Sequence, residues 1–233
     1  MTYNNIIINA DNIDEAFEKW YDLLSTDIEL QESRDGDVVG EIIGAITVIS
    51  DPTRCIMKND IRKLPMRYCI GELLWYLSAN NNLSAIQHYT SAWDRMSDDG
   101  KIVNSNYGTL IKKYYGFDQL KMCEDILINN PNSRQAIIHI KPARNIINNP
   151  TKDLPCTVSL QFFIRDDKLY LITYMRSNDI WMGFPYDVFQ FTCMQIYLAM
   201  KLNVDLGTYT HVAGSLHLYK RNLKEVDNED QVN

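Results

Sequence analysis

One stretch in the second half of the chain constrains its fold more than any other. Residues 156–175 read CTVSLQFFI, then RDDK, then LYLITYM. Two runs rich in β-branched and aromatic residues on either side of a short polar segment predict antiparallel strands joined by a turn. We place the turn at Asp166 and Asp167. The chain therefore contains at least one long β-hairpin.

The remaining segments mix helical and strand patterns. Phe17, Trp20, Tyr21 and Leu24 recur at helical spacing, which predicts an amphipathic helix over 12–25. We expect further helices over 66–79, 117–128 and 186–202, and strands over 39–50, 134–140 and 207–219. Strict alternation of strands and helices is missing, so the pattern favours the α+β class.

The chain has no linker rich in proline, glycine or serine. We therefore predict a single domain over residues 1–233, with a polar C-terminal tail from about 222 to 233. No apolar run approaches the ~18 residues of a membrane span, and the N-terminus lacks the features of a signal peptide. We expect a cytoplasmic protein without a membrane partner.

The net charge of −7 and the lack of a block rich in lysine or arginine argue against a nucleic-acid polymer as partner. An anionic small molecule would need a few specific arginines. Three arginines with small or polar neighbours are candidates. Each alone is typical of the surface, and together they would form a phosphate site only if they converge: Arg34, Arg134 and Arg176.

The cysteines and histidines do not form a recognisable framework. The five cysteines are an odd number without a CxxC motif, and the four histidines are scattered. This predicts reduced thiols and no metal. Cys156 is then either a small buried hydrophobic residue or a nucleophile activated by a nearby cation such as Arg176. A thiol hydrolase is a further possibility, but no Cys–His motif supports it.

Two further features allow a structural or a functional interpretation. Glu72 is the lone acid of the apolar segment IGELLWYL. It either faces solvent or lies buried with a raised pKa and transfers protons. His217 and Tyr219 are alternate residues of a predicted strand and share a face. They form either an ordinary core or surface pair, or a pair that holds a hydroxyl group.

Taken together, four motifs resemble the thymidylate synthase family, which includes pyrimidine nucleotide hydroxymethylases. The motifs are ELLWYL, LPC with its QFF strand, RSNDIWMGFPYD and GSLHLY, and the match runs from about Arg34 to Tyr219. The resemblance implies a thymidylate synthase-like fold with a large mixed sheet flanked by helices. It also implies a homodimer packed through the sheet, with Arg134 supplied across the interface.

The resemblance also implies site residues. Cys156 would add to C6 of the pyrimidine, and Glu72 with Tyr107 would manage proton transfers. The residues implied for the nucleotide phosphate and sugar are Arg34, Arg134, Arg176, Ser177, His217 and Tyr219. Those implied for the co-substrate 5,10-methylenetetrahydrofolate are Trp93, Asp179, Met182, Gly183 and Tyr186. No metal is implied.

Asp187 narrows this resemblance. Thymidylate synthases carry asparagine at its position, whose amide matches uracil. Aspartate accepts from the exocyclic amine of cytosine, and it either donates its proton to N3 or pairs with protonated N3. The chain is thus most similar to the (deoxy)cytidylate 5-hydroxymethylases of bacteriophages. Thr157 and Met175, where the synthases have histidine and glutamine, are further departures.

The expected activity is transfer of a one-carbon unit from methylenetetrahydrofolate to C5 of dCMP, with addition of water. The products would be 5-hydroxymethyl-dCMP and tetrahydrofolate, formed in the host cytoplasm of a bacteriophage. The alternatives are a divergent thymidylate synthase, a hydroxymethylase of dUMP or CMP, or an inactive homologue that binds nucleotides or RNA. Retention of Cys156, Glu72 and Asp187 argues against the last.

Overall fold

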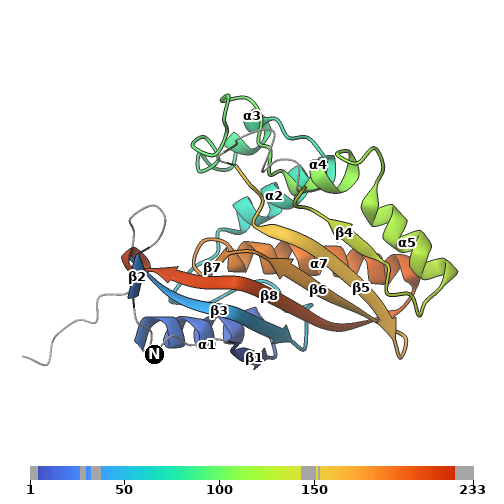
Figure 1. Cartoon of the computed structure of the whole chain (residues 1–233), viewed down its shortest axis with the longest axis horizontal. Coiled ribbons are helices and arrows are strands. Elements are labelled where there is room, and N and C mark those ends of the chain that lie inside the picture. Colours follow the sequence, from blue (N-terminus) through green and yellow to red (C-terminus); the bar gives the residue numbers. More distant parts are fainter. Residues whose placement is uncertain (1–4, 27–29, 33–37, 143–150, 152, 224–233) are drawn as a thin grey trace, which may run out of the picture.

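The computed structural model describes residues 5–26, 30–32, 38–142, 151 and 153–223 (Figure 1). Within them, eight strands form one sheet of order β1-β3-β8-β6-β5-β4, with β2 paired to β3 and β7 paired to β8. The strands are β1 Ile7–Ala10, β2 Leu30–Glu32, β3 Val38–Ile49, β4 Ile137–His139, β5 Thr157–Arg165, β6 Lys168–Met175, β7 Asn178–Asp179 and β8 Asp205–Tyr219.

The predicted hairpin is confirmed as β5 and β6. Arg165 pairs with Lys168, and the two residues between them, Asp166 and Asp167, have φ of +50° and +55°. Positive φ at both central residues gives the turn whose twist matches that of the strands, and aspartate tolerates this conformation. β8 pairs in parallel with β6 and antiparallel with β3, so the sheet is mixed.

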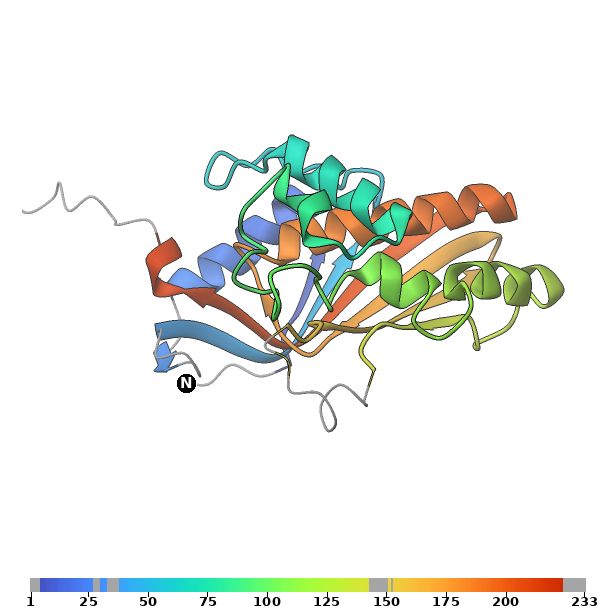
Figure 2. The same ribbon diagram turned by 90° about the horizontal axis from the view of Figure 1, so that it is seen from above.

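The helices lie on one face of this sheet (Figure 2). They include α1 Ile13–Thr26, α2 Met66–Ser78, α3 Leu83–Gln87, α4 Tyr107–Lys112, α5 Gln119–Asn129 and α7 Phe184–Leu202, and the 3₁₀ helix η1 spans Lys220–Asn222. The α+β class and the four predicted helices are confirmed, with ends that shift by at most two residues. Among the described residues, no helix combines the length and apolar character needed to cross a bilayer.

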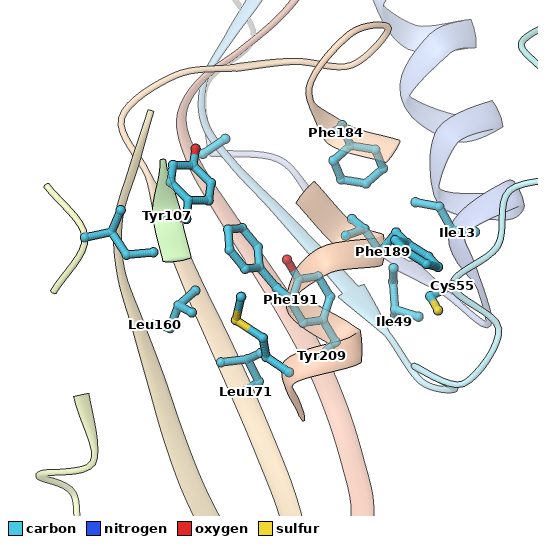
Figure 3. Close-up of a cluster of buried hydrophobic side chains, with 14 of the residues drawn as sticks. Ile13, Ile49, Cys55, Tyr107, Leu160, Leu171, Phe184, Phe189, Phe191 and Tyr209 are labelled. Atoms are coloured by element: carbon cyan, nitrogen blue, oxygen red, sulfur yellow. The ribbon is translucent and has the colours of Figure 1, made fainter. Parts of the chain in front are cut away.

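The core forms between the helices and the covered face of the sheet. Figure 3 shows Phe184, Phe189 and Phe191 of α7 among buried side chains of the strands. The rings of Phe191 and Tyr107 stack with centroids 5.8 Å apart. Since a buried aromatic ring contributes a large apolar area, these contacts fix α7 and α4 on the sheet. α7 in turn carries Asp187 in its first turn.

The opposite face of the sheet carries apolar side chains that no described helix covers. Ile172 and Tyr174 of β6 are half-buried, and Tyr174 pairs with Val212 of β8. Val212 pairs in turn with Ile46 of β3, and Val158 at the start of β5 is 38% exposed. A contiguous apolar sheet surface of this kind is typical of a protein interface.

Candidate active site

The candidate nucleophile and its nearest cation meet at one end of the hairpin. Cys156 directly precedes β5 and Arg176 directly follows β6, and the Arg176 amide donates to the Cys156 carbonyl at 2.9 Å. The Arg176 guanidinium donates to the carbonyls of Pro155 and Leu154, both at 3.1 Å. Burial raises the pKa of the Cys156 thiol, and the positive charge of Arg176 opposes this rise. The arginine therefore shapes the loop and favours the reactive thiolate.

Asp153 is a residue of this loop that the sequence did not identify. It is buried, and its Oδ2 accepts the backbone N–H of Ser105 at 2.9 Å. Burial raises its pKa, and its negative charge also raises the pKa of Cys156. The bond ties the loop before Cys156 to the segment that leads into α4. No motif marks Asp153, because its partner lies far away in the sequence.

Glu72 lies buried on α2 and does not face solvent. Its Oε1 accepts the hydroxyl groups of Tyr68 at 2.7 Å and Tyr76 at 3.1 Å, and its Oε2 accepts Nε2 of Gln190 at 3.2 Å. Burial raises its pKa from an ordinary value of 4.5 to about 7, although the three hydrogen bonds oppose the rise. A carboxyl group that titrates near neutral pH can both donate and accept protons.

Tyr107 joins this carboxyl group to the region of the thiol. Its ring stacks on that of Tyr76, with centroids 5.2 Å apart. Burial raises its pKa, and the negative charges of Asp187 and Cys156 add to the effect. These couplings place the phenol of Tyr107 near Asp187 and Cys156, and its stacking partner Tyr76 bonds Glu72. The four residues predicted to be catalytic thus lie in one buried polar region.

This proximity depends on a close contact between α2 and α4. A Cβ atom on Gly108 of α4 would lie 1.8 Å from the carbonyl oxygen of Tyr76. Only a residue without a side chain allows the two helices to approach this closely. Gly108 is therefore the residue that lets Tyr107 reach Tyr76 and Glu72.

Asp187 faces an amide that the sequence did not single out. It lies in the first turn of α7, and its Oδ2 accepts Nδ2 of Asn178 at 2.8 Å. Burial raises its pKa well above the ordinary value, and the negative charge of Glu72 adds to this. The bond from Asn178 acts in the opposite direction. Negatively charged neighbours and burial both favour the neutral acid at this position.

Asn178 is held from its other side by a histidine. Its Oδ1 lies 3.0 Å from Nε2 of His211, and Nδ1 of His211 lies 2.8 Å from the hydroxyl group of Tyr209. All three side chains are buried. In the sequence these residues appear only as polar positions on two separate segments, β7 and β8. The pairing of these segments could not be predicted from the sequence.

The residues predicted for the folate site surround the same carboxyl groups. Trp93 donates its Nε1 to the Tyr68 hydroxyl at 3.0 Å, and Tyr68 in turn bonds Glu72. Tyr186 packs edge-on against Tyr68 at 4.8 Å. The Asp179 carboxylate accepts the backbone N–H groups of Trp181 at 2.8 Å and Met182 at 3.3 Å, which shapes the turn before α7. Burial raises the pKa of Asp179.

Arg62 is a further residue of this region that the sequence analysis missed. Its guanidinium donates to the hydroxyl group of Tyr186 at 3.0 Å and to the carbonyl of Trp181 at 2.6 Å. The guanidinium also lies over the rings of Tyr186 and Trp181, 5.4 Å and 5.7 Å from their centroids. Arg62 thereby fixes Tyr186, a residue of the candidate folate site, together with the neighbouring Trp181.

The structure does not bring all of the remaining predicted residues into this region. His217 and Tyr219 do share a face of β8, with ring centroids 5.2 Å apart, and burial lowers the pKa of His217. Ser177 lies half-buried between Arg176 and Asn178. The Arg134 side chain is exposed, and only its carbonyl is fixed, by Nε2 of Gln161 at 3.1 Å. Arg34 lies outside the described residues.

Comparison with known proteins settles the family. The family model described as thymidylate synthase matches residues 21–232. The chain belongs to the thymidylate synthase family. A protein named deoxyuridylate hydroxymethyltransferase, from Bacillus phage SP01, is 31% identical over 220 residues. The match covers 86% of this chain and 56% of that protein, so the chain spans little more than half the length of its relative.

Membership of the thymidylate synthase family gives the buried acids and the thiol a common context. A nucleophilic sulfur, a cation that favours its thiolate and two carboxyl groups with raised pKa values suit addition to a ring carbon followed by proton transfer. Among the described residues, no cluster of three or more histidine, cysteine, aspartate or glutamate side chains has the arrangement of a metal site.

Proposed function

We propose that the chain transfers a one-carbon unit from 5,10-methylenetetrahydrofolate to C5 of dCMP and adds water, giving 5-hydroxymethyl-dCMP and tetrahydrofolate. The observation that carries the proposal is Asp187, a half-buried carboxyl group with a raised pKa where thymidylate synthases have an asparagine amide. A carboxyl group presents the acceptor that the exocyclic amine of cytosine requires, and an asparagine amide suits uracil.

The residues of the chain would divide the chemistry as follows. The Cys156 thiolate forms a bond to C6, and the electrons of the C5–C6 double bond make C5 nucleophilic. Asp187 supports this step by sharing a proton with N3, which withdraws electrons from C6. Glu72 and Tyr107 transfer the protons, including the one that leaves C5. C5 would bond to the methylene carbon of the co-substrate, and loss of the C5 proton with cleavage of the C–N bond would release tetrahydrofolate and leave an exocyclic methylene group. Water then adds to this methylene group, and the S–C6 bond breaks to release Cys156.

Methylenetetrahydrofolate would supply the carbon atom that becomes the hydroxymethyl group. The residues present fit a flat aromatic ligand beside Glu72. Trp93 and Tyr186 offer partly accessible rings on either side of Tyr68, and Met182 is 47% exposed. Arg62 keeps Tyr186 in place. These side chains would hold and orient the ligand, with Asp179 and Gly183 forming the adjacent turn.

A second candidate substrate is dUMP. The name of the phage relative favours it, and so does the raised pKa of Asp187. A neutral carboxylic acid carries one donor and one acceptor, as an amide does. A protonated Asp187 could therefore accept from N3–H of uracil and donate to O4. The two bases differ in which carboxyl oxygen must carry the proton.

The sugar, the phosphate and the assembly complete the proposal. Arg176, Ser177 and Arg34 would bind the phosphate, and His217 with Tyr219 would hold the sugar hydroxyl. The uncovered apolar face of the sheet supports a homodimer, because a surface of this kind is usually buried in an interface. In that dimer Arg134 would reach the phosphate of the partner's site.

The test is a direct product analysis. The purified protein is incubated with methylenetetrahydrofolate and either dCMP, dUMP or CMP, and the nucleotide product is identified by mass. We expect a hydroxymethyl product from dCMP without formation of dihydrofolate. A hydroxymethyl product from dUMP alone would replace the first candidate by the second. A methyl product with dihydrofolate would identify a synthase, and a Cys156→Ala variant provides the inactive control.

A further inference from the structure

A row of buried hydrogen bonds leads away from the candidate base-reading residue into the core. Tyr209, His211, Asn178 and Asp187 follow one another with contacts of 2.8, 3.0 and 2.8 Å. The first two residues lie on β8, Asn178 lies on β7, and Asp187 lies on α7. The side chain of Phe184 packs edge-on against His211 at 5.2 Å and closes the row on one side.

The chemistry of these groups determines which of them donates and which accepts each hydrogen bond, and this order is the direction of the row. Burial lowers the pKa of His211 to about 3, so its ring is neutral and carries one N–H. The amide oxygen of Asn178 can only accept, so Nε2 of His211 must be the donor. Nδ1 is then the acceptor and takes the hydroxyl proton of Tyr209. The Asn178 amide is left with its N–H₂ group directed at Asp187.

A reversed amide would require the proton of His211 to move to Nδ1 and the proton of Asp187 to move to Oδ2. Without these shifts it would place the oxygen of Asn178 against an oxygen of Asp187 and its N–H₂ group against Nε2–H of His211. Space is also restricted, because a Cβ atom on Gly183 would lie 2.7 Å from Nδ2 of Asn178 and 3.3 Å from Oδ2 of Asp187. The glycine allows the amide and the carboxyl group to meet at the start of α7.

The direction of the amide distinguishes the two oxygens of Asp187. Oδ2 accepts an N–H bond from Asn178, and a carbonyl-type oxygen accepts more strongly than a carboxylic O–H oxygen. The proton of the neutral acid is therefore placed on Oδ1. Cytosine requires the acid proton on the oxygen that faces N3, and uracil requires it on the oxygen that faces the 4-position. The location of the proton therefore selects between the two bases.

We propose that His211 and Asn178, supported by Tyr209, are positioning residues that fix which oxygen of Asp187 carries the proton and so set the base selectivity of the enzyme. This inference rests on the proposed function, since it assumes that Asp187 reads the base. It adds that the selection does not reside in Asp187 alone. The same aspartate without this row would discriminate less well between cytosine and uracil.

The variant His211→Phe tests the proposal. It keeps a ring in the pocket and removes the donor to Asn178, so the amide can reverse. We expect the ratio of kcat/KM for the preferred base over the other to fall by about tenfold, the usual effect of losing one buried hydrogen bond. Tyr209→Phe removes only the bond that orders the His211 tautomer and should give a smaller fall. His211→Gln supplies an amide N–H and should restore part of the ratio.

A matched control lies on the neighbouring strand. Thr47 of β3 pairs with His211 in the sheet and accepts Nε1 of Trp20 at 2.8 Å. Thr47→Val therefore removes a buried hydrogen bond beside the row without touching it. We expect it to lower the thermal midpoint and to leave the base ratio unchanged. An unchanged ratio in folded, active His211→Phe, or an equal fall in Thr47→Val, would overturn the proposal.

A second measurement does not depend on turnover. Nitrogen-15 NMR of the wild-type protein should show His211 as a neutral ring with its proton on Nε2, between pH 5.5 and 8. A proton on Nδ1, or titration in this range, would overturn the direction of the row even in an active enzyme. If neither dCMP nor dUMP reacts, the proposed function fails, whereas the tautomer still decides the arrangement around Asp187.

Discussion

At the scale of single residues, a buried acid, Glu72, and a half-buried acid, Asp187, dominate the candidate site. Glu72 and Asp187 both have raised pKa values, and the charge of Glu72 contributes to the rise at Asp187. Two carboxyl groups that interact in this way resist simultaneous ionisation. A pair of acids that resists double ionisation is useful where a ring nitrogen and a ring carbon must each exchange a proton during turnover.

The raised pKa of Glu72 predicts that the free energy of unfolding depends on pH. Between pH 4.5 and about 7 the unfolded chain loses the proton of Glu72 while the folded protein keeps it. Stability therefore falls as the pH rises through this window, by about 3 kcal/mol for this group, and changes no further above it. Glu72→Gln should remove that part of the slope. The measurement is the free energy of unfolding by urea at several pH values.

The difference between the two slopes reports the titration of Glu72 together with the part of the Asp187 titration that depends on the charge of Glu72. Parallel curves for the wild type and Glu72→Gln would show that the carboxyl group titrates at its ordinary pKa in the folded state. Turnover should also fall by about a hundredfold or more in this variant, as expected for loss of a proton-transferring group.

At the scale of elements, the local patterns predicted most of what formed. The hairpin, with its turn at Asp166 and Asp167, and the amphipathic helix α1 depend on neighbouring residues, and both were predictable. The row from Tyr209 to Asp187 was not. It exists because β7 pairs in parallel with β8 and because α7 starts beside them, and a single sequence does not encode that register in any local signal. Arg62 and Asp153 were not predicted as site residues for the same reason.

The close contact between α2 and α4 predicts that a side chain at position 108 destabilises the protein. Gly108→Ala places a methyl group against the backbone of α2, where the carbonyl of Tyr76 cannot move without breaking the helix. We expect a loss of about 3 kcal/mol or more in stability, at the upper end of overpacking effects. Gly100→Ala is the comparison, since Gly100 has a positive φ of +69° but open space around it.

Chemical denaturation of both variants separates the two causes. The Gly100 variant should lose only about 1 kcal/mol, the cost of a left-handed residue with a side chain. Equal losses at the two positions would mean that the structure relieves the clash at 108 at little cost, because Gly108 is helical and has no positive φ. A stable Gly108→Ala protein would contradict the close approach of Tyr107 to Tyr76.

At the scale of the whole molecule, the helices cover one face of the sheet and leave apolar side chains on the other (Figure 2). If two copies pack through this face, residues near it could complete the partner's site. Arg134 is the candidate, because its side chain is exposed while Cys156 and Arg176 sit together on the same chain. Neither Arg134→Ala nor Cys156→Ala should then be active alone.

Mixing these two variants tests the shared site. In a mixed dimer the Arg134→Ala subunit keeps its own Cys156 and receives Arg134 from the Cys156→Ala subunit, so one of its two sites is intact. With random exchange of subunits, activity should recover to roughly a quarter of that of the wild type, as expected for twofold symmetric pairing. Each variant incubated with more of itself is the control. No recovery, with dimers present by sedimentation, would mean that Arg134 serves its own subunit.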